Sequence, residues 1–178
     1  MQLVKANRVI ADRYQRVLDD AGLPDGPILL QAERFLADSA ELAARAAPVG
    51  VVWPNNRKVA DLAPHLDRLA LIVLGFPTFK DGRAYSQARQ LREQCGFQGE
   101  LRASGDVLRD QYLFLVRAGF DAFEVRKDAD VAAFVDPPAR YSVFYQPAGD
   151  TRASALRRRL DGRRDADTSM PALQAADF

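Results

Sequence analysis

Short apolar runs alternate along the chain with segments whose apolar residues recur every three or four positions. The runs are rich in β-branched and aromatic residues and are bounded by Gly or Pro, a composition that favours strands. We predict strands at residues 27–30, 49–53, 69–74, 99–102, 120–125 and 141–145, and a leading strand at residues 8–12.

Helical spacing fills the intervals between these runs. The first two helices are predicted from the apolar faces Phe35, Leu36, Leu42, Ala43, Ala46 and Ala84, Ala88, Leu91, Cys95. A third helix begins at Ser104 or Asp106, since either side chain suits an N-cap, and ends at Gly119. A fourth begins at Asp128 and stops before Pro137.

This alternation predicts an α/β fold of repeated βα units with a mostly parallel sheet. An eight-unit barrel typically needs roughly 250 residues, and this chain has 178. We therefore expect either a partial barrel or an open, doubly wound sheet. An incomplete barrel would leave sheet edges that a second copy of the chain could cover in a homodimer.

The pattern predicts one α/β domain over residues 1–146 and a different segment over residues 147–178. This second segment is rich in Arg and poor in apolar residues. One interpretation is a flexible tail with a short helix over residues 153–160, which Gly162 would end. The alternative is a basic arm that binds an acidic partner.

Composition narrows the classes of function. The net charge of +1 gives no reason to expect a nucleic-acid partner. With one Cys and one His the chain lacks the ligands for an iron–sulfur cluster or a multi-histidine metal site. No dinucleotide or Walker motif is present, so no cofactor is predicted. Without an apolar signal segment or membrane span, we expect a cytoplasmic protein.

The first candidate site is the loop over residues 76–86, because ligands of parallel α/β folds bind beyond the carboxyl ends of strands. Asp81 and Gly82 suit a turn, and Lys80, Arg83 and Arg89 could hold a small oxyanion. The alternative is that these cations make ordinary surface salt bridges. The polar residues that complete this loop and helix are Tyr85 and Ser86.

The second candidate site is the loop over residues 103–111, with Arg102 at its entrance. Its candidate residues are Arg102, Gly105, Asp106, Arg109 and Asp110. Asp106 and Asp110 lie four positions apart, so they could share acid–base work or hold a divalent cation. A structural interpretation is that they cap the helix and pair with Arg102 or Arg109. No catalytic residue is assigned.

Three runs carry a family resemblance: residues 76–92 (FPTFKDGRAYSQARQLR), 99–111 (GELRASGDVLRDQ) and 117–123 (RAGFDAF). They resemble a bacterial family of unknown function that is encoded beside the hemoprotein subunit of assimilatory sulfite reductase. The resemblance implies an auxiliary role in reducing sulfite during sulfate assimilation and cysteine synthesis. It also implies that the hemoprotein is the partner of this chain. The hemoprotein would supply the redox centres that this chain lacks.

Two other functions stay open. A free-standing enzyme could bind a sulfur or phosphorus oxyanion at the two loops. Alternatively, the protein could be a structural interaction module, in which the same charged residues only hold the two loops together.

Overall fold

The structure is a computed structural model that describes residues 1–136, 144–145 and 154–168, the last seven of these by their backbone alone. The chain divides into two compact units, Met1–Pro138 and Ala139–Phe178. The second unit contains helix α6 (Ala155–Thr168) and a parallel bridge between Phe144 and Ser154. In the described part of the chain no helix combines the length and the apolar character needed to cross a membrane.

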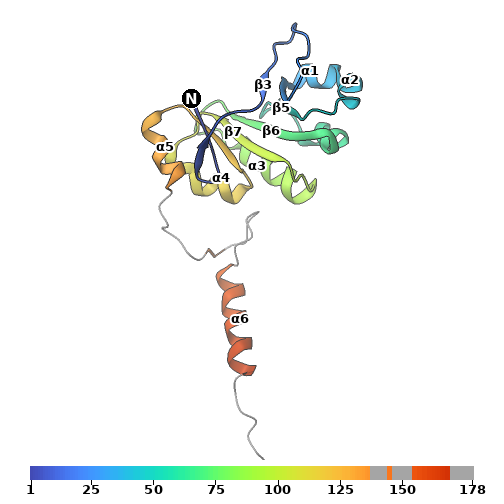
Figure 1. The fold of residues 1–178 in the computed structure, drawn as a ribbon. Helices are drawn as coiled ribbons and strands as arrows, with labels where there is room; N and C mark the ends of the chain where they lie inside the picture. Colours follow the sequence, from blue (N-terminus) through green and yellow to red (C-terminus); the bar gives the residue numbers. More distant parts are fainter. Residues whose placement is uncertain (137–143, 146–153, 169–178) are drawn as a thin grey trace, which may run out of the picture. The chain divides into compact units, whose positions relative to one another are not determined.

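The first unit is built on one eight-stranded sheet with the order β2-β1-β8-β7-β6-β5-β4-β3 (Figure 1). From β3 to β8 the strands follow chain order and pair in parallel. The strands are β1 (Gln2–Lys5), β2 (Arg8–Ile10), β3 (Gln15–Arg16), β4 (Ile28–Gln31), β5 (Val49–Trp53), β6 (Leu69–Phe76), β7 (Glu100–Gly105) and β8 (Ala122–Val125).

Helical segments follow each of the parallel strands from β4 to β8. They are α1 (Ala32–Ala37), α2 (Ser39–Ala43), the 3₁₀ segment η1 (Val59–Arg68), α3 (Arg83–Arg89), its π-helical continuation η2 (Gln90–Gln94), the 3₁₀ turn η3 (Arg109–Gln111), α4 (Tyr112–Ala118) and α5 (Asp128–Val135).

The helices bury one face of the sheet. Ile72 and Leu74 of β6 belong to the main core together with residues of α1 to α5, whereas Leu71 and Val73 belong to a small cluster on the other face. This alternation follows from the two-residue period of a strand. The sheet is therefore covered by helices on one side and curled into a half-barrel, which confirms the partial-barrel alternative.

One ion pair demonstrates the curl. Arg16 of β3 and Glu124 of β8 are separated by four intervening strands, yet their side chains meet at 2.6 Å. Neighbouring strands lie about 4.8 Å apart, so a flat sheet would hold these residues too far apart for contact. The uncovered face of the sheet is thus concave, and the edge strand β3 approaches β8 across it.

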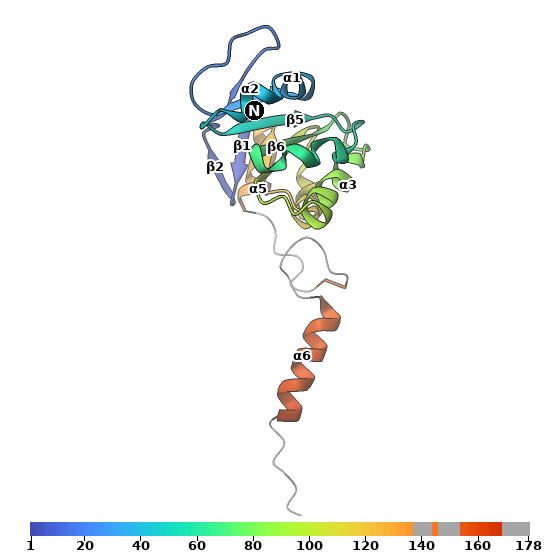
Figure 2. The same cartoon turned by 90° about the vertical axis from the view of Figure 1, so that its right-hand side faces the viewer.

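Several predicted boundaries are wrong in informative ways. The leading strand is a hairpin, β1 and β2, that lies at one edge of the sheet (Figure 2) and turns through Ala6 and Asn7 at positive φ. Strand β7 continues to Gly105, so neither Ser104 nor Asp106 caps the third helix, which begins at Tyr112. Helix α6 runs through Gly162. Of the predicted strand 141–145, residues 141–143 lie outside the described part.

Candidate functional site

The two predicted loops lie side by side at the carboxyl ends of β6 and β7. The backbone N–H of Phe79 donates to Oδ2 of Asp106 at 2.9 Å, and Nε2 of Gln111 donates to the carbonyl of Phe79 at 3.2 Å. The backbone N–H of Asp106 in turn donates to the carbonyl of Phe76 at 2.8 Å. Asp106 therefore works as an anchor that fixes one loop to the other.

Gly105 permits this close approach. Its φ of +99° lies in the left-handed region, and a Cβ at this position would lie 2.3 Å from the carbonyl oxygen of Phe76. Only glycine adopts this conformation without strain and leaves room for the neighbouring backbone. The resulting tight junction places the two loops on a common rim.

Arg83 is already paired. Its Nε and one terminal nitrogen donate to the two oxygens of Asp81 at 3.0 and 2.6 Å, and Asn55 donates to the same carboxylate at 2.8 Å. The hydrogen bond from Arg83 is the main reason that the pKa of Asp81 lies well below its ordinary value. The same bond raises the pKa of Arg83.

The remaining cations of the first loop do not all converge. Lys80 lies over the ring of Phe79, with its Nζ 5.6 Å from the ring centroid. Arg89 is exposed on α3 one to two turns beyond Arg83. Gly82 and Ser86 are exposed at the start of the helix, as are Arg109 and Asp110 on the neighbouring loop.

Tyr85 lies in a more apolar setting than its neighbours. Its ring packs edge-on against Phe76 and Phe120, with centroid distances of 5.1 and 6.5 Å. Burial, helped by the negative charge of Asp110, raises the pKa of Tyr85 to about 12. Tyr85 therefore packs against the core. The charge of Asp110, which helps to raise its pKa, relates Tyr85 to the second loop.

Arg102 does not reach the loop that it was predicted to enter. It lies within β7 on the concave face, is 1% exposed, and pairs with Asp12 at 2.6 Å and Glu100 at 3.0 Å. A third carboxylate, Glu124, lies 3.3 Å away. The placement follows from strand alternation, because Arg102 points to the face opposite its core-facing neighbours Leu101 and Ala103.

Arg102 is the centre of a group that we call the inner cluster. Its members are Lys5, Asp12, Arg16, Glu100, Arg102, Ser104 and Glu124. Burial raises the pKa of Asp12, but hydrogen bonds from Arg102 and from the backbone of Tyr14 outweigh this effect and lower it. Burial lowers the pKa of Arg102, and the bonds and charges of Asp12 and Glu100 raise it overall.

The sequence contains a signal for this cluster. Glu100, Arg102 and Ser104 alternate with Leu101 and Ala103 in a run of which residues 99–102 were predicted as a strand, and Glu124 lies within the predicted strand 120–125. Polar residues at every second position of consecutive strands indicate a polar sheet face. Asp12 and Arg16 come from a distant segment, and their part in the cluster depends on the curl.

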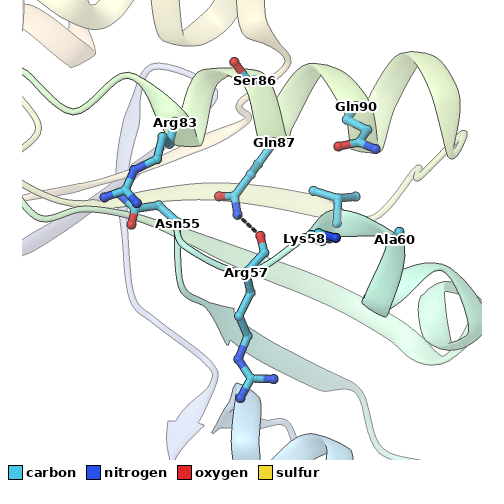
Figure 3. Close-up of a pocket in the computed structure, with 9 residues that line it drawn as sticks. Asn55, Arg57, Lys58, Ala60, Arg83, Ser86, Gln87 and Gln90 are labelled. Atoms are coloured by element: carbon cyan, nitrogen blue, oxygen red, sulfur yellow. Dashed lines mark hydrogen bonds between the residues drawn. The ribbon is translucent and has the colours of Figure 1, made fainter.

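A hollow of about 310 Å³ lies between α3 and the segment that follows β5 (Figure 3). We call it the α3 hollow. It is lined by Asn55, Arg57, Lys58, Val59, Ala60, Arg83, Ser86, Gln87 and Gln90. Of these, only Arg83 and Ser86 were in the predicted site. The residues that follow β5 come close to α3 because β5 and β6 pair in parallel.

Comparison with known proteins identifies the chain at the level of its family. A family described as bacterial protein of unknown function (DUF934) matches residues 50–156, which include both loops, the α3 hollow and strands β6 to β8. Comparison with curated proteins found no match. The match covers more than half of the 178 residues, and the chain therefore belongs to this family of bacterial proteins.

Proposed function

We propose that the protein is an auxiliary protein of assimilatory sulfite reduction that binds the hemoprotein subunit of sulfite reductase. The pathway and the partner rest on the resemblance carried by residues 76–92, 99–111 and 117–123. In this proposal the hemoprotein supplies the redox centres. The chain contributes a binding surface, and the geometry of Phe79 is the observation that supports this choice over a free-standing enzyme.

Phe79 is an exposed aromatic residue on a rigid loop. Its side chain is 48% exposed. Both of its backbone polar groups are fixed, the N–H by Asp106 and the carbonyl by Gln111. A large apolar ring that is exposed to solvent adds little to the stability of the folded chain. It suits an interface, where aromatic anchors contribute much of the binding energy. Because the loop is already ordered, binding would cost little conformational entropy.

Charged residues surround this anchor. Lys80, Arg109 and Asp110 are exposed on the two joined loops. Such a polar rim adds specificity and raises the association rate more than it adds affinity. We call Phe79 and these three residues the Phe79 surface, and we assign the contact with the hemoprotein to it.

A gene deletion tests the pathway. Cells without the protein are expected to grow on sulfide but not on sulfate or sulfite, because only sulfide bypasses the reduction step. The wild-type gene on a plasmid should restore growth on all three sulfur sources. Normal growth of the deletion strain on sulfite would refute the assignment.

A binding measurement tests the surface. Phe79→Ser should weaken the binding of purified hemoprotein by at least about tenfold, as expected for the loss of an aromatic anchor. The matched control is Phe114→Ser, since Phe114 is 67% exposed on α4 but lies outside the three resembling runs. Equal affinity of the Phe79 variant and the wild type, measured by calorimetry, would remove this surface from the proposal.

A further inference from the structure

The lining of the α3 hollow carries an unbalanced positive charge. Lys58 and Arg83 contribute two cations and no carboxylate lines the hollow, whereas Figure 3 shows the guanidinium of Arg57 turned away from Gln87 and α3. Glu33 pairs with Arg57 from outside at 2.7 Å, and Asp81 does the same for Arg83. In the described part of the chain Lys58 makes no ion pair. Its charge is therefore available to an anion.

Gln87 provides a second and independent observation. The residue is 6% exposed, and its Nε2 donates to the carbonyls of Pro54 and Arg57 at 3.0 and 2.9 Å. Because both partners are acceptors, the orientation of the amide is determined. Its Oε1 is buried and has no hydrogen-bond partner within the described residues. Figure 3 shows this oxygen turned toward Asn55 and Arg83.

These two observations restrict the chemistry of a ligand. A buried acceptor without a donor costs about 1–3 kcal/mol, so a ligand that supplies an N–H or O–H to Gln87 would recover this free energy. A bare dianion has no proton to donate and would be repelled by the amide oxygen. The cations, in contrast, require a negative group, and an Arg can bind two of its oxygens at once.

The size of the hollow agrees with a small organic molecule. Its volume of about 310 Å³ lies at the lower end of the range for ligand pockets, and it exceeds what a single oxyanion would fill. Exposed lining residues, among them Lys58, Ala60 and Ser86, leave it accessible from solvent.

We propose that the α3 hollow binds a small organic anion in which a phosphate, sulfate or sulfonate group is attached to a carbon skeleton that carries a hydroxyl or amine. Lys58 and Arg83 bind the anionic group. Gln87 accepts the hydrogen bond from the hydroxyl or amine. The site uses none of the residues of the Phe79 surface, so it can be tested on the purified protein without the hemoprotein.

Calorimetry on the full-length chain separates the alternatives for the ligand. Glycerol 3-phosphate and 2-hydroxyethanesulfonate represent the phosphate and sulfonate arms, with inorganic phosphate, inorganic sulfate and glycerol as comparisons. At least one organic anion should bind about tenfold more tightly than the matching inorganic anion, because it alone can bond to Gln87. Binding of neither organic anion at millimolar concentration, or equal binding of inorganic and organic anions, would overturn the proposal.

Two variants locate the binding. Lys58→Gln should weaken the binding of the organic anion by about tenfold, whereas Lys127→Gln, at an exposed lysine outside the hollow, should leave it unchanged. Wild-type affinity of the Lys58 variant would refute the site. Gln87→Met should also abolish the preference for glycerol 3-phosphate over ethyl phosphate, which has no donor. Because Lys58 is exposed, its variant decides the question even where the Gln87 variant fails to fold.

Discussion

The inner cluster and the α3 hollow contain similar residues but differ in how their charges are balanced. In the inner cluster three cations, Lys5, Arg16 and Arg102, face three carboxylates, and every one of these six groups is ion-paired. The hollow has two cations, Lys58 and Arg83, and no carboxylate in its lining. A balanced cluster completes itself on folding, whereas the hollow keeps one cation, Lys58, that makes no ion pair in the described part of the chain and is open to an anion from solvent.

The environment of a charged side chain distinguishes a structural role from a role in binding better than its position in the sequence does. Arg83 lies in the first resembling run, inside the first predicted loop, and Arg102 lies in the second run, directly before the second loop. Arg102 is 1% exposed at the centre of its cluster, and the side chain of Arg83 is 58% exposed at the edge of the hollow. Their environments therefore assign the first to the fold, whereas the second, although paired with Asp81, stays open to solvent at the hollow.

The largest expected effect comes from breaking the inner cluster. Arg102→Met removes the buried cation that Asp12, Glu100 and Glu124 share, so Asp12 loses its ion pair and Glu100 and Glu124 keep only Lys5 and Arg16. We expect the free energy of unfolding to fall by about 3–5 kcal/mol, measured by urea denaturation. Arg89→Met, at an exposed site, should change it by less than about 0.5 kcal/mol. Equal stabilities of the two variants would show that the cluster contributes nothing to the fold.

A smaller effect is expected at the junction of the two loops. Gly105→Ala places a Cβ 2.3 Å from the carbonyl oxygen of Phe76 in a residue with positive φ, and should cost about 1–3 kcal/mol or more. Gly82→Ala is the control, because a Cβ there meets nothing within 4 Å and φ is −82°. Urea denaturation of both variants should show a loss at Gly105 alone. A loss of similar size at Gly82 would contradict the account.

Much of the fold could be predicted because apolar periodicity is a local property. Strand β5 and the apolar face of α3 were read directly from Val, Ile, Leu and Ala positions, and Gly119 at the end of α4 has the expected φ of +103°. The hairpin of β1 and β2 was missed because its turn uses Ala6 and Asn7, whereas glycine is the usual signal for such turns.

The candidate site was predictable only in part. The adjacency of the two loops followed from parallel strands, which bring their carboxyl ends to one edge. The role of Asp106 as a backbone anchor and the approach of Lys58 to α3 did not follow. Each depends on a contact between segments far apart in the chain, and such contacts leave no periodic signal in the sequence.

The smallest effect concerns the pH dependence that Tyr85 introduces where the two loops meet. Burial and the charge of Asp110 raise its pKa from 10.0 to about 12, so the folded chain retains the phenol proton over a range in which the unfolded chain loses it. This contribution to stability is fully present below about pH 10 and is lost as the pH rises toward about 12. Tyr85→Phe keeps the ring contacts with Phe76 and Phe120, and its stability should fall less steeply over this window in urea denaturation at increasing pH. Asp110→Asn should reduce the slope only slightly, because burial is the larger cause. If Tyr85→Phe retained the wild-type slope, Tyr85 would be excluded as its source, and the electrostatic link between α3 and the second loop would be refuted.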